Sequence, residues 1–376
     1  MTTIRQLRTS FLVAALALLT GTASSDGLAG AERLGIQRTP NGYRVPVYGM
    51  SFTRNAEGTL GTECARLTAP QLEAARFRPA VSRALMVSYP HATIQAASGA
   101  TFTIIYTDAE GTGFNDPARG AARKAAMQAS VAAWSAVLQG TVPIVVDAKM
   151  ETPEDPESTL LASAGPIDFF DLDGVAVPSA LAAQVRNRSL NNGGADIQVL
   201  VNETVDWDYA INGAAAPGKA SFVYTMIHEV GHGLGFLDSF DVSTGQLMNS
   251  IPFPYDVFVN RGSAGADVVA NHGPEQVLAD LTSNDLFFSG PKAVEASARS
   301  IRPLPMVKLY APDPYEPGSS IAHLDQDTYA DFKTGLMTPR DFGSGTNKID
   351  ILTLGIMADI GYQLVPGAAT ARTPRR

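Results

Sequence analysis

Apolar and polar residues recur with recognisable periods in the middle of the chain. β-branched and aromatic residues with a period near two predict strands. The expected strands are residues 101–107, 141–150 and 195–203. Residues 117–139 repeat apolar positions at helical spacing, with Asp116 as cap and Gly140 as the stop. The buried face of this helix is expected to consist of Met127, Val131, Trp134 and Leu138. Because strand, helix and strand follow one another, we expect the first two strands to be parallel.

Weaker patterns surround this unit. Residues 151–192 carry many turn-forming residues and are expected to be loop-rich. Residues 241–322 show little periodicity and many Pro and Gly, with one short helix expected over 275–281. An irregular insertion of this length is usually functional. Residues 349–360 are expected to form a closing helix that Gly361 ends.

Residues 221–235 predict a helix with Ser221 as its N-cap. His228 and His232 would lie one turn apart on one face of it, so both imidazoles can reach the same metal ion. Glu229 would lie beside that face, where it can take a proton from a zinc-activated water and return it to a leaving group. This is the HExxH pattern. We expect His228 and His232 to bind zinc and Glu229 to be the general base.

The pattern is specific in this chain, because histidine occurs only five times. The alternative is a helix whose two histidines merely form hydrogen bonds. Three glycines argue against it, since each costs a helix about 1 kcal/mol relative to alanine. They are Gly231, Gly233 and Gly235. We expect them to allow close backbone approach and to end the helix after Gly235.

A catalytic zinc usually takes three protein ligands. Asp238 is the local candidate for the third, at a position where the pattern HExxHxxGxxH has histidine. Glu275 would come from a later helix, and His323 from far down the chain, followed by Met337. If Asp238 is the ligand, Met248 competes with Met337 for the turn beneath the metal. The remaining histidines, His91 and His272, are expected to be ordinary surface or hydrogen-bonded residues.

The segments HEVGHGLGF, AHLDQDTY, GLMTP and DIGY, with the long insertion between the first two, resemble the leishmanolysin-type metzincins. A group of secreted bacterial relatives is still more similar through SNDLFF, KLYAP and PGSSIAHLD. The likeness covers residues 195–362, and more loosely the segment from 101. It implies an α+β fold, with a metzincin-like zincin catalytic domain, a twisted mixed sheet, an active-site helix and a C-terminal subdomain after that helix.

The resemblance also implies roles for single residues. His228, His232 and His323 would be the zinc ligands, with Glu229 as general base. Met337 would be the methionine of the turn beneath the metal. Asp238 stays the alternative third ligand, because the small snapalysin-like metzincins have an aspartate at this place.

The expected function is that of a secreted zinc-dependent endopeptidase acting on protein or peptide substrates. The alternative is a non-catalytic surface or adhesin-like binding protein on a metzincin fold. Cys64 is the only cysteine, so no intramolecular disulfide can form. One hypothesis is that its thiolate occupies the open zinc position in a latent form, as the cysteine switch does in some metzincins. The other is a structural or incidental cysteine.

Composition and charge further limit the class of protein to which the chain can belong. The chain has 376 residues, 45% of them hydrophobic and 17% charged, which is typical of a globular protein. Its net charge of -9 argues against a nucleic-acid partner. The acidic stretch 168–174, DFFDLDG, lacks the spacing of a calcium loop, so we expect a turn there and find no clear calcium motif.

The N-terminus predicts export. Arg5 and Arg8 precede a short apolar run over residues 11–19, which is typical of a signal peptide and too short to cross a bilayer of about 30 Å. We expect a secreted protein without a membrane span. The expected parts of the chain are a signal peptide (1–25), a pro-segment or N-terminal subdomain (26–97), the zinc metalloprotease domain (98–366) and a disordered tail (367–376).

Overall fold

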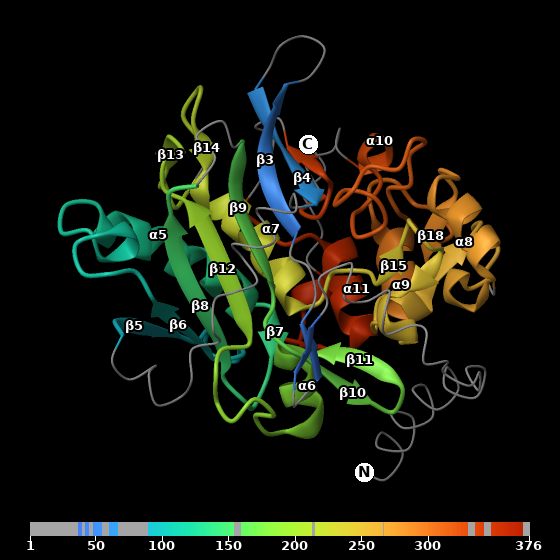
Figure 1. Cartoon of the computed structure of the whole chain (residues 1–376), viewed down its shortest axis with the longest axis horizontal. Helices are drawn as coiled ribbons and strands as arrows, with labels where there is room; N and C mark the ends of the chain where they lie inside the picture. The colour runs from blue at the N-terminus through green and yellow to red at the C-terminus, as the bar shows by residue number, and fades with distance from the viewer. Residues whose placement is uncertain are drawn as a thin grey trace.

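The computed structural model describes four N-terminal strands within residues 37–66, and residues 89–153, 159–212, 215–265, 267–329, 335–341 and 347–370. The signal peptide expected over residues 1–25 lies outside them, as do residues 371–376 of the tail. In the described part, the chain has a mixed α and β architecture around one large mixed sheet (Figure 1). The expectation of an α+β fold with a mixed sheet is therefore confirmed.

The main sheet has eight strands in the order β20-β4-β3-β9-β12-β8-β6-β5. Their bounds are Arg340–Asp341 (β20), Leu60–Arg66 (β4), Tyr48–Arg54 (β3), Leu160–Pro166 (β9), Ile197–Asn202 (β12), Ile144–Glu151 (β8), Phe102–Tyr106 (β6) and His91–Ile94 (β5). β6, β8 and β12 run parallel, as expected for the first two. The remaining neighbours pair antiparallel.

Shorter strands form small sheets around the main one. They are β1 (Gln37–Thr39), β2 (Gly42–Arg44), β7 (Leu138–Gln139), β10 (Phe169–Leu172), β11 (Val175–Pro178), β13 (Trp207–Asp208), β14 (Ala220–Ser221), β15 (Phe240–Asp241), β16 (Gln246–Leu247), β17 (Val259–Arg261), β18 (Leu286–Phe288), β19 (Val307–Lys308) and β21 (Gln363–Leu364). The α-helices are α5 (Gly120–Ser135), α6 (Ser179–Arg186), α7 (Phe222–Leu234), α8 (Pro274–Leu281), α9 (Pro291–Arg299), α10 (Gln326–Tyr329) and α11 (Ile351–Ile360). In the part of the chain that the structure describes, none of these helices has the length and apolar character needed to cross a membrane.

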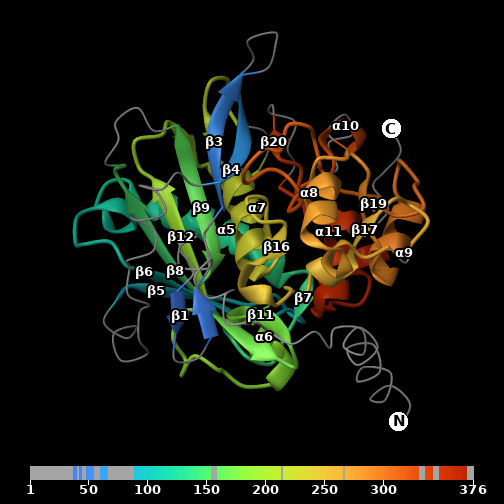
Figure 2. The same cartoon turned by 45° about the vertical axis from the view of Figure 1, so that its right-hand side comes forward.

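Helices α5 and α7 pack against each other and against the main sheet (Figures 1 and 2). Two side chains of α5 bind the backbone of α7: Trp134 Nε1 donates to Ile227 O at 2.9 Å, and Ser130 Oγ donates to Val223 O at 3.2 Å. The expected buried face of α5 is fully buried, including Trp134. These contacts fix the position of α7 relative to α5.

The bounds expected for α5 were too wide. The carboxylate of Asp116 accepts hydrogen bonds from the backbone N of Ala118 and of Arg119, both at 2.8 Å. These bonds stabilise a turn ahead of the helix, so α5 begins at Gly120 rather than at residue 117. The helix ends at Ser135, and the buried Leu138 belongs to strand β7 instead.

The expectation of a loop-rich region over residues 151–192 is wrong. This stretch contains β9, the hairpin β10–β11 and helix α6. β9 is built mostly from small residues, and its strand conformation comes from pairing with β12 on one side and β3 on the other. In the acidic stretch 168–174, where we expected a turn, residues 169–172 form strand β10, and only Asp173 and Gly174 form the turn of the hairpin. Gly174 N donates to Asp171 Oδ1 at 2.8 Å.

Most of the chain after α7 forms a second group of elements beside the main sheet, drawn in orange and red in Figure 2, while β20 joins the edge of the main sheet. It contains α8, as expected, together with α9 and the three-stranded sheet β17-β18-β19. Helix α11 follows its expected bounds closely. Asp350 caps its start by accepting from Leu352 N and Thr353 N, and Gly361 ends it.

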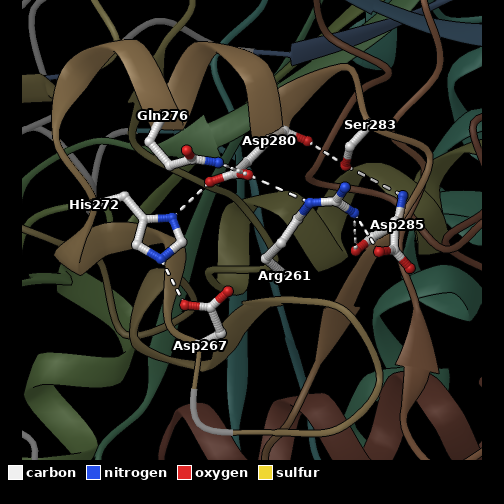
Figure 3. A network of polar contacts seen from close by, with 7 residues as sticks. All are labelled: Arg261, Asp267, His272, Gln276, Asp280, Ser283 and Asp285. Atoms are coloured by element: carbon white, nitrogen blue, oxygen red, sulfur yellow. Dashed lines mark hydrogen bonds and ion pairs between the residues drawn. The ribbon is translucent and has the colours of Figure 1, made fainter.

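A polar network ties the insertion together (Figure 3). His272 Nδ1 lies 2.6 Å from Asp280 on α8, and its Nε2 lies 2.8 Å from Asp267. Arg261 on β17 pairs with Asp280 at 3.4 Å and also with Asp285. His272 is therefore a hydrogen-bonded residue, as expected.

Candidate metal centre

Helix α7 has the boundaries that its sequence predicts. Ser221 Oγ accepts from Tyr224 N at 3.3 Å at its start, and Gly235 ends it with a φ of 115°. A Cβ at Gly231 would lie 3.0 Å from the sulfur of Met337, and one at Gly233 would lie 2.4 Å from Ile197. The glycines therefore allow the close backbone approach that we expected.

Three imidazoles meet in the interior beside this helix. His232 Nε2 lies 3.1 Å from His228 Nε2 and 3.2 Å from His323 Nε2, and the third separation, between His323 and His228, is 3.3 Å. All three side chains are fully buried. The structure thus brings the distal histidine back to the pair on the helix.

Backbone carbonyls orient each ring. The Nδ1 atoms of His228, His232 and His323 lie 2.8, 2.7 and 2.9 Å from the carbonyl oxygens of residues 336, 236 and 319, respectively. An Nδ1–H that donates to a carbonyl leaves Nε2 as a lone-pair donor to a metal. Burial also lowers the pKa of His228 to about 4. Burial and the neighbouring imidazoles lower the pKa values of His232 and His323 well below their ordinary value, so the rings are neutral.

A fourth donor completes the group. Cys64 is fully buried on β4, and its Sγ lies 3.7 Å from His232 Nε2. The four candidate ligand atoms all lie within 4.8 Å of one another. Of the residues that the structure describes, this is the one group of histidine, cysteine and acidic side chains that could hold a metal ion.

The spacing of the donors fits a four-coordinate ion. Tetrahedral zinc with Zn–N bonds of about 2.0–2.1 Å and a Zn–S bond of about 2.3 Å separates two nitrogens by about 3.4 Å, and nitrogen from sulfur by about 3.6 Å. The three separations between nitrogens, 3.1 to 3.3 Å, and the 3.7 Å from Cys64 Sγ to His232 Nε2 are close to these values, while the four atoms as a group span up to 4.8 Å. Thiolate and imidazole are also donors that zinc accepts readily. The residues present therefore suit a zinc ion.

Cys64 is held in place by the segments that carry the other parts of the site. Its backbone N donates to Pro339 O at 2.7 Å, and its carbonyl accepts from the Ser319 hydroxyl. Ser319 is also the residue whose carbonyl orients His323. Both backbone groups of Cys64 are thus hydrogen-bonded, which fixes the position of the residue that carries the thiol.

Glu229 is fully buried directly after the first histidine of the helix. Its Oε2 accepts a hydrogen bond from Ala164 N on β9 at 3.0 Å. β9 is the antiparallel strand that pairs with β3. The carboxylate is therefore anchored between α7 and the backbone of the main sheet.

Met337 lies in a turn beneath the helix. Thr338 N donates to Gly335 O at 3.3 Å across this turn, and the carbonyl of Leu336 is the one that orients His228. Met337 is fully buried against Gly231. Met248, the rival candidate, lies instead in a separate apolar cluster around Phe253.

The other candidate ligands are not part of the metal group. Asp238 is buried, and its Oδ1 accepts from Phe240 N at 3.0 Å. Glu275 is exposed on α8, and His91 is exposed on β5. Sequence reasoning did not identify Ala164 or the three orienting carbonyls, because any residue type supplies a backbone group and no sequence signal marks it.

Comparisons with protein-family models, with curated proteins and with solved structures found no match to this chain. A function for the chain therefore has to be inferred from the arrangement of its own residues.

Proposed function

We propose that this protein is a zinc-dependent endopeptidase with a metzincin-like catalytic domain. The observation that carries the proposal is the convergence of three neutral imidazole Nε2 atoms, 3.1 to 3.3 Å apart, beside a buried glutamate on the same helix. His228, His232 and His323 would hold the ion. Met337 would form the apolar floor of the site.

A zinc ion bound here would supply Lewis acidity, which lowers the pKa of water and polarises a carbonyl group. The protein's own contribution to the chemistry is the movement of one proton. Glu229 would accept the proton from the attacking water and deliver it to the leaving amine. The hydrogen bond from Ala164 N would hold the carboxylate in one orientation during both steps.

A peptide substrate is supported by the strand next to Glu229. An extended peptide can add to the edge of a sheet through main-chain hydrogen bonds. One edge of β9 pairs with β12 and the other with β3. If β3 were absent, the second edge would be open to a peptide beside the general base. This feature favours peptides over other hydrolysable substrates.

The N-terminal strands support a latent form of the same enzyme. β3 pairs with β9, and the next strand, β4, brings Cys64 to the three imidazoles. We propose that the thiolate fills the zinc position that water and substrate need, and that residues 26–97 act as a pro-segment. Displacement of Cys64 would then activate the protein.

The proposed setting is outside the cell, with the signal peptide at residues 1–25 directing export. Signal-peptide cleavage in an exporting host would support this, and retention of residue 1 in the exported protein would contradict it.

Casein hydrolysis tests the activity directly. The purified chain, treated with a thiol reagent to displace Cys64, is expected to cleave casein, to lose this activity with a chelator and to regain it with zinc. If the chain is instead a non-catalytic binding protein, it is expected to bind zinc but to cleave no casein under any of these conditions.

A further inference from the structure

The third histidine does not lie on a regular element. His228 and His232 are fixed by the hydrogen bonds of α7, whereas His323 precedes α10 in an irregular segment at the end of the insertion. The position of its ring therefore depends on whatever holds this segment in place.

The segment contains a strained residue. Ile321 is fully buried and has a φ of 72°. Ala322 N donates to Ser320 O at 2.9 Å, so the chain makes a γ-turn centred on Ile321. Positive φ is a costly conformation for a β-branched residue and persists only when its surroundings enforce it.

Two tyrosines supply that enforcement. Ile321 N donates to Tyr310 O at 2.7 Å, and Tyr310 N donates to His323 O at 3.0 Å. On the other side of the turn, the hydroxyl of Tyr255 donates to Ile321 O at 3.0 Å. Both backbone groups of the strained residue are thus bonded, one of them by a side chain.

The ring of Tyr255 is itself held between two aromatic residues. Its centroid lies 5.3 Å from that of Phe236 and 5.0 Å from that of Phe288. Phe236 is the residue whose carbonyl orients His232. Tyr255 therefore contacts the supports of two of the three imidazoles, one through its ring and one through its hydroxyl.

We infer that Tyr255 is a positioning residue that sets His323 by fixing the strained turn at Ile321. The inference rests on the proposed zinc site and deepens it. It also gives the long insertion a purpose, because Tyr255 and its neighbour Phe288 both come from residues 241–322. Without the hydroxyl, the turn keeps only its hydrogen bonds to Tyr310, and the ring of His323 is held less firmly.

Zinc affinity, measured by competition with a chromophoric chelator, tests the inference in the full-length chain. Groups that orient a metal ligand directly change affinity about 10- to 100-fold. Tyr255 bonds the turn at Ile321 and not the ring of His323 itself. Its effect should therefore be smaller, and Tyr255→Phe is expected to raise the zinc Kd by about three- to tenfold. The Co²⁺-loaded variant is also expected to show an altered visible absorption spectrum.

Tyr362→Phe is the matched control. Tyr362 is also buried, and its hydroxyl donates to a backbone carbonyl, Leu234 O, at 2.9 Å. That carbonyl belongs to the regular helix α7. Loss of the Tyr362 hydroxyl is therefore expected to lower the melting temperature but to leave the zinc Kd within about twofold.

Equal zinc affinity and equal Co²⁺ spectra in Tyr255→Phe and the wild type would overturn the inference. Zinc binding by the wild type with the expected loss in Tyr255→Phe, but without peptide hydrolysis, would support it while overturning the proposed function. Failure of the wild type to bind zinc would overturn both.

Discussion

The thiol sulfur of Cys64 lies 3.7 Å from Nε2 of His232, although 168 positions separate the two residues in the chain. Strand β4, which carries Cys64, lies between β3 and β20 in the main sheet. The N-terminal strands and the histidine cluster are therefore one structural unit. In the proposed latent form, the Cys64 thiolate would occupy the fourth position of the zinc ion.

Replacing Cys64 by Ser is expected to activate the full-length chain. The hydroxyl is a poorer zinc ligand than a thiolate, so the closed form is destabilised. We expect casein hydrolysis to rise at least about tenfold, corresponding to about 1.4 kcal/mol. A thiol reagent should activate the wild type and leave Cys64→Ser unchanged. Equal basal activity of the two proteins would refute latency through Cys64.

Glu229→Gln separates proton transfer from metal binding. The amide keeps the shape of the side chain but cannot accept a proton, so turnover is expected to fall about 10²- to 10⁴-fold. Zinc content, measured by atomic emission, should stay at the wild-type level. A fully active variant would show that Glu229 is not the general base.

His323→Ala and Asp238→Ala distinguish the two candidates for the third ligand. The first variant is expected to lose most of its zinc after dialysis, because it removes one of the three converging nitrogens. The second is expected to keep its zinc and to lose about 1–3 kcal/mol of stability, since Asp238 accepts a buried backbone hydrogen bond. The reverse result would make Asp238 the ligand.

The insertion is expected to lose stability as pH rises. Burial alone lowers the pKa of His272, but the hydrogen bonds and charges of Asp280 and Asp267 outweigh it and raise the pKa above the ordinary value. A raised folded-state pKa contributes stability that is complete below about pH 6.5 and is lost as pH rises through the higher folded value.

Melting temperatures between pH 5.5 and 9 test this effect. His272→Asn is expected to cost about 1–3 kcal/mol at pH 5.5 and less at pH 9. His91→Asn is the control, because His91 is exposed and bonds to the backbone of Tyr89. A penalty for His272→Asn that does not depend on pH would contradict the charged state of the ring.

The strongly patterned elements could be predicted from the sequence. Period and capping identified β6, β12, α7 and α11, because their apolar residues face one core and their ends carry the residues that caps require. β9 was missed, since its small residues have little strand preference and long-range pairing determines its conformation. The strand propensities of single residues carry no information about such long-range pairing.

The residues of the candidate site also differ in how far the sequence could predict them. Spacing on one helix was enough to pair His228 with His232. From the residues alone, His323 was one of three candidates for the third ligand, because the insertion that returns it has no period. Cys64 could be named only as a hypothesis, since strand pairing across the main sheet brings it to the histidines. Tyr255 carried no sequence signal, because its role depends on a backbone conformation.

Zinc K-edge absorption of the full-length protein tests the central claim most directly. We predict one zinc ion per chain with three nitrogen neighbours at about 2.0–2.1 Å and one sulfur at about 2.3 Å. The sulfur should disappear in Cys64→Ser, and one nitrogen should disappear in His323→Ala. A chain without zinc, or a spectrum that neither substitution changes, would contradict the proposed metal centre.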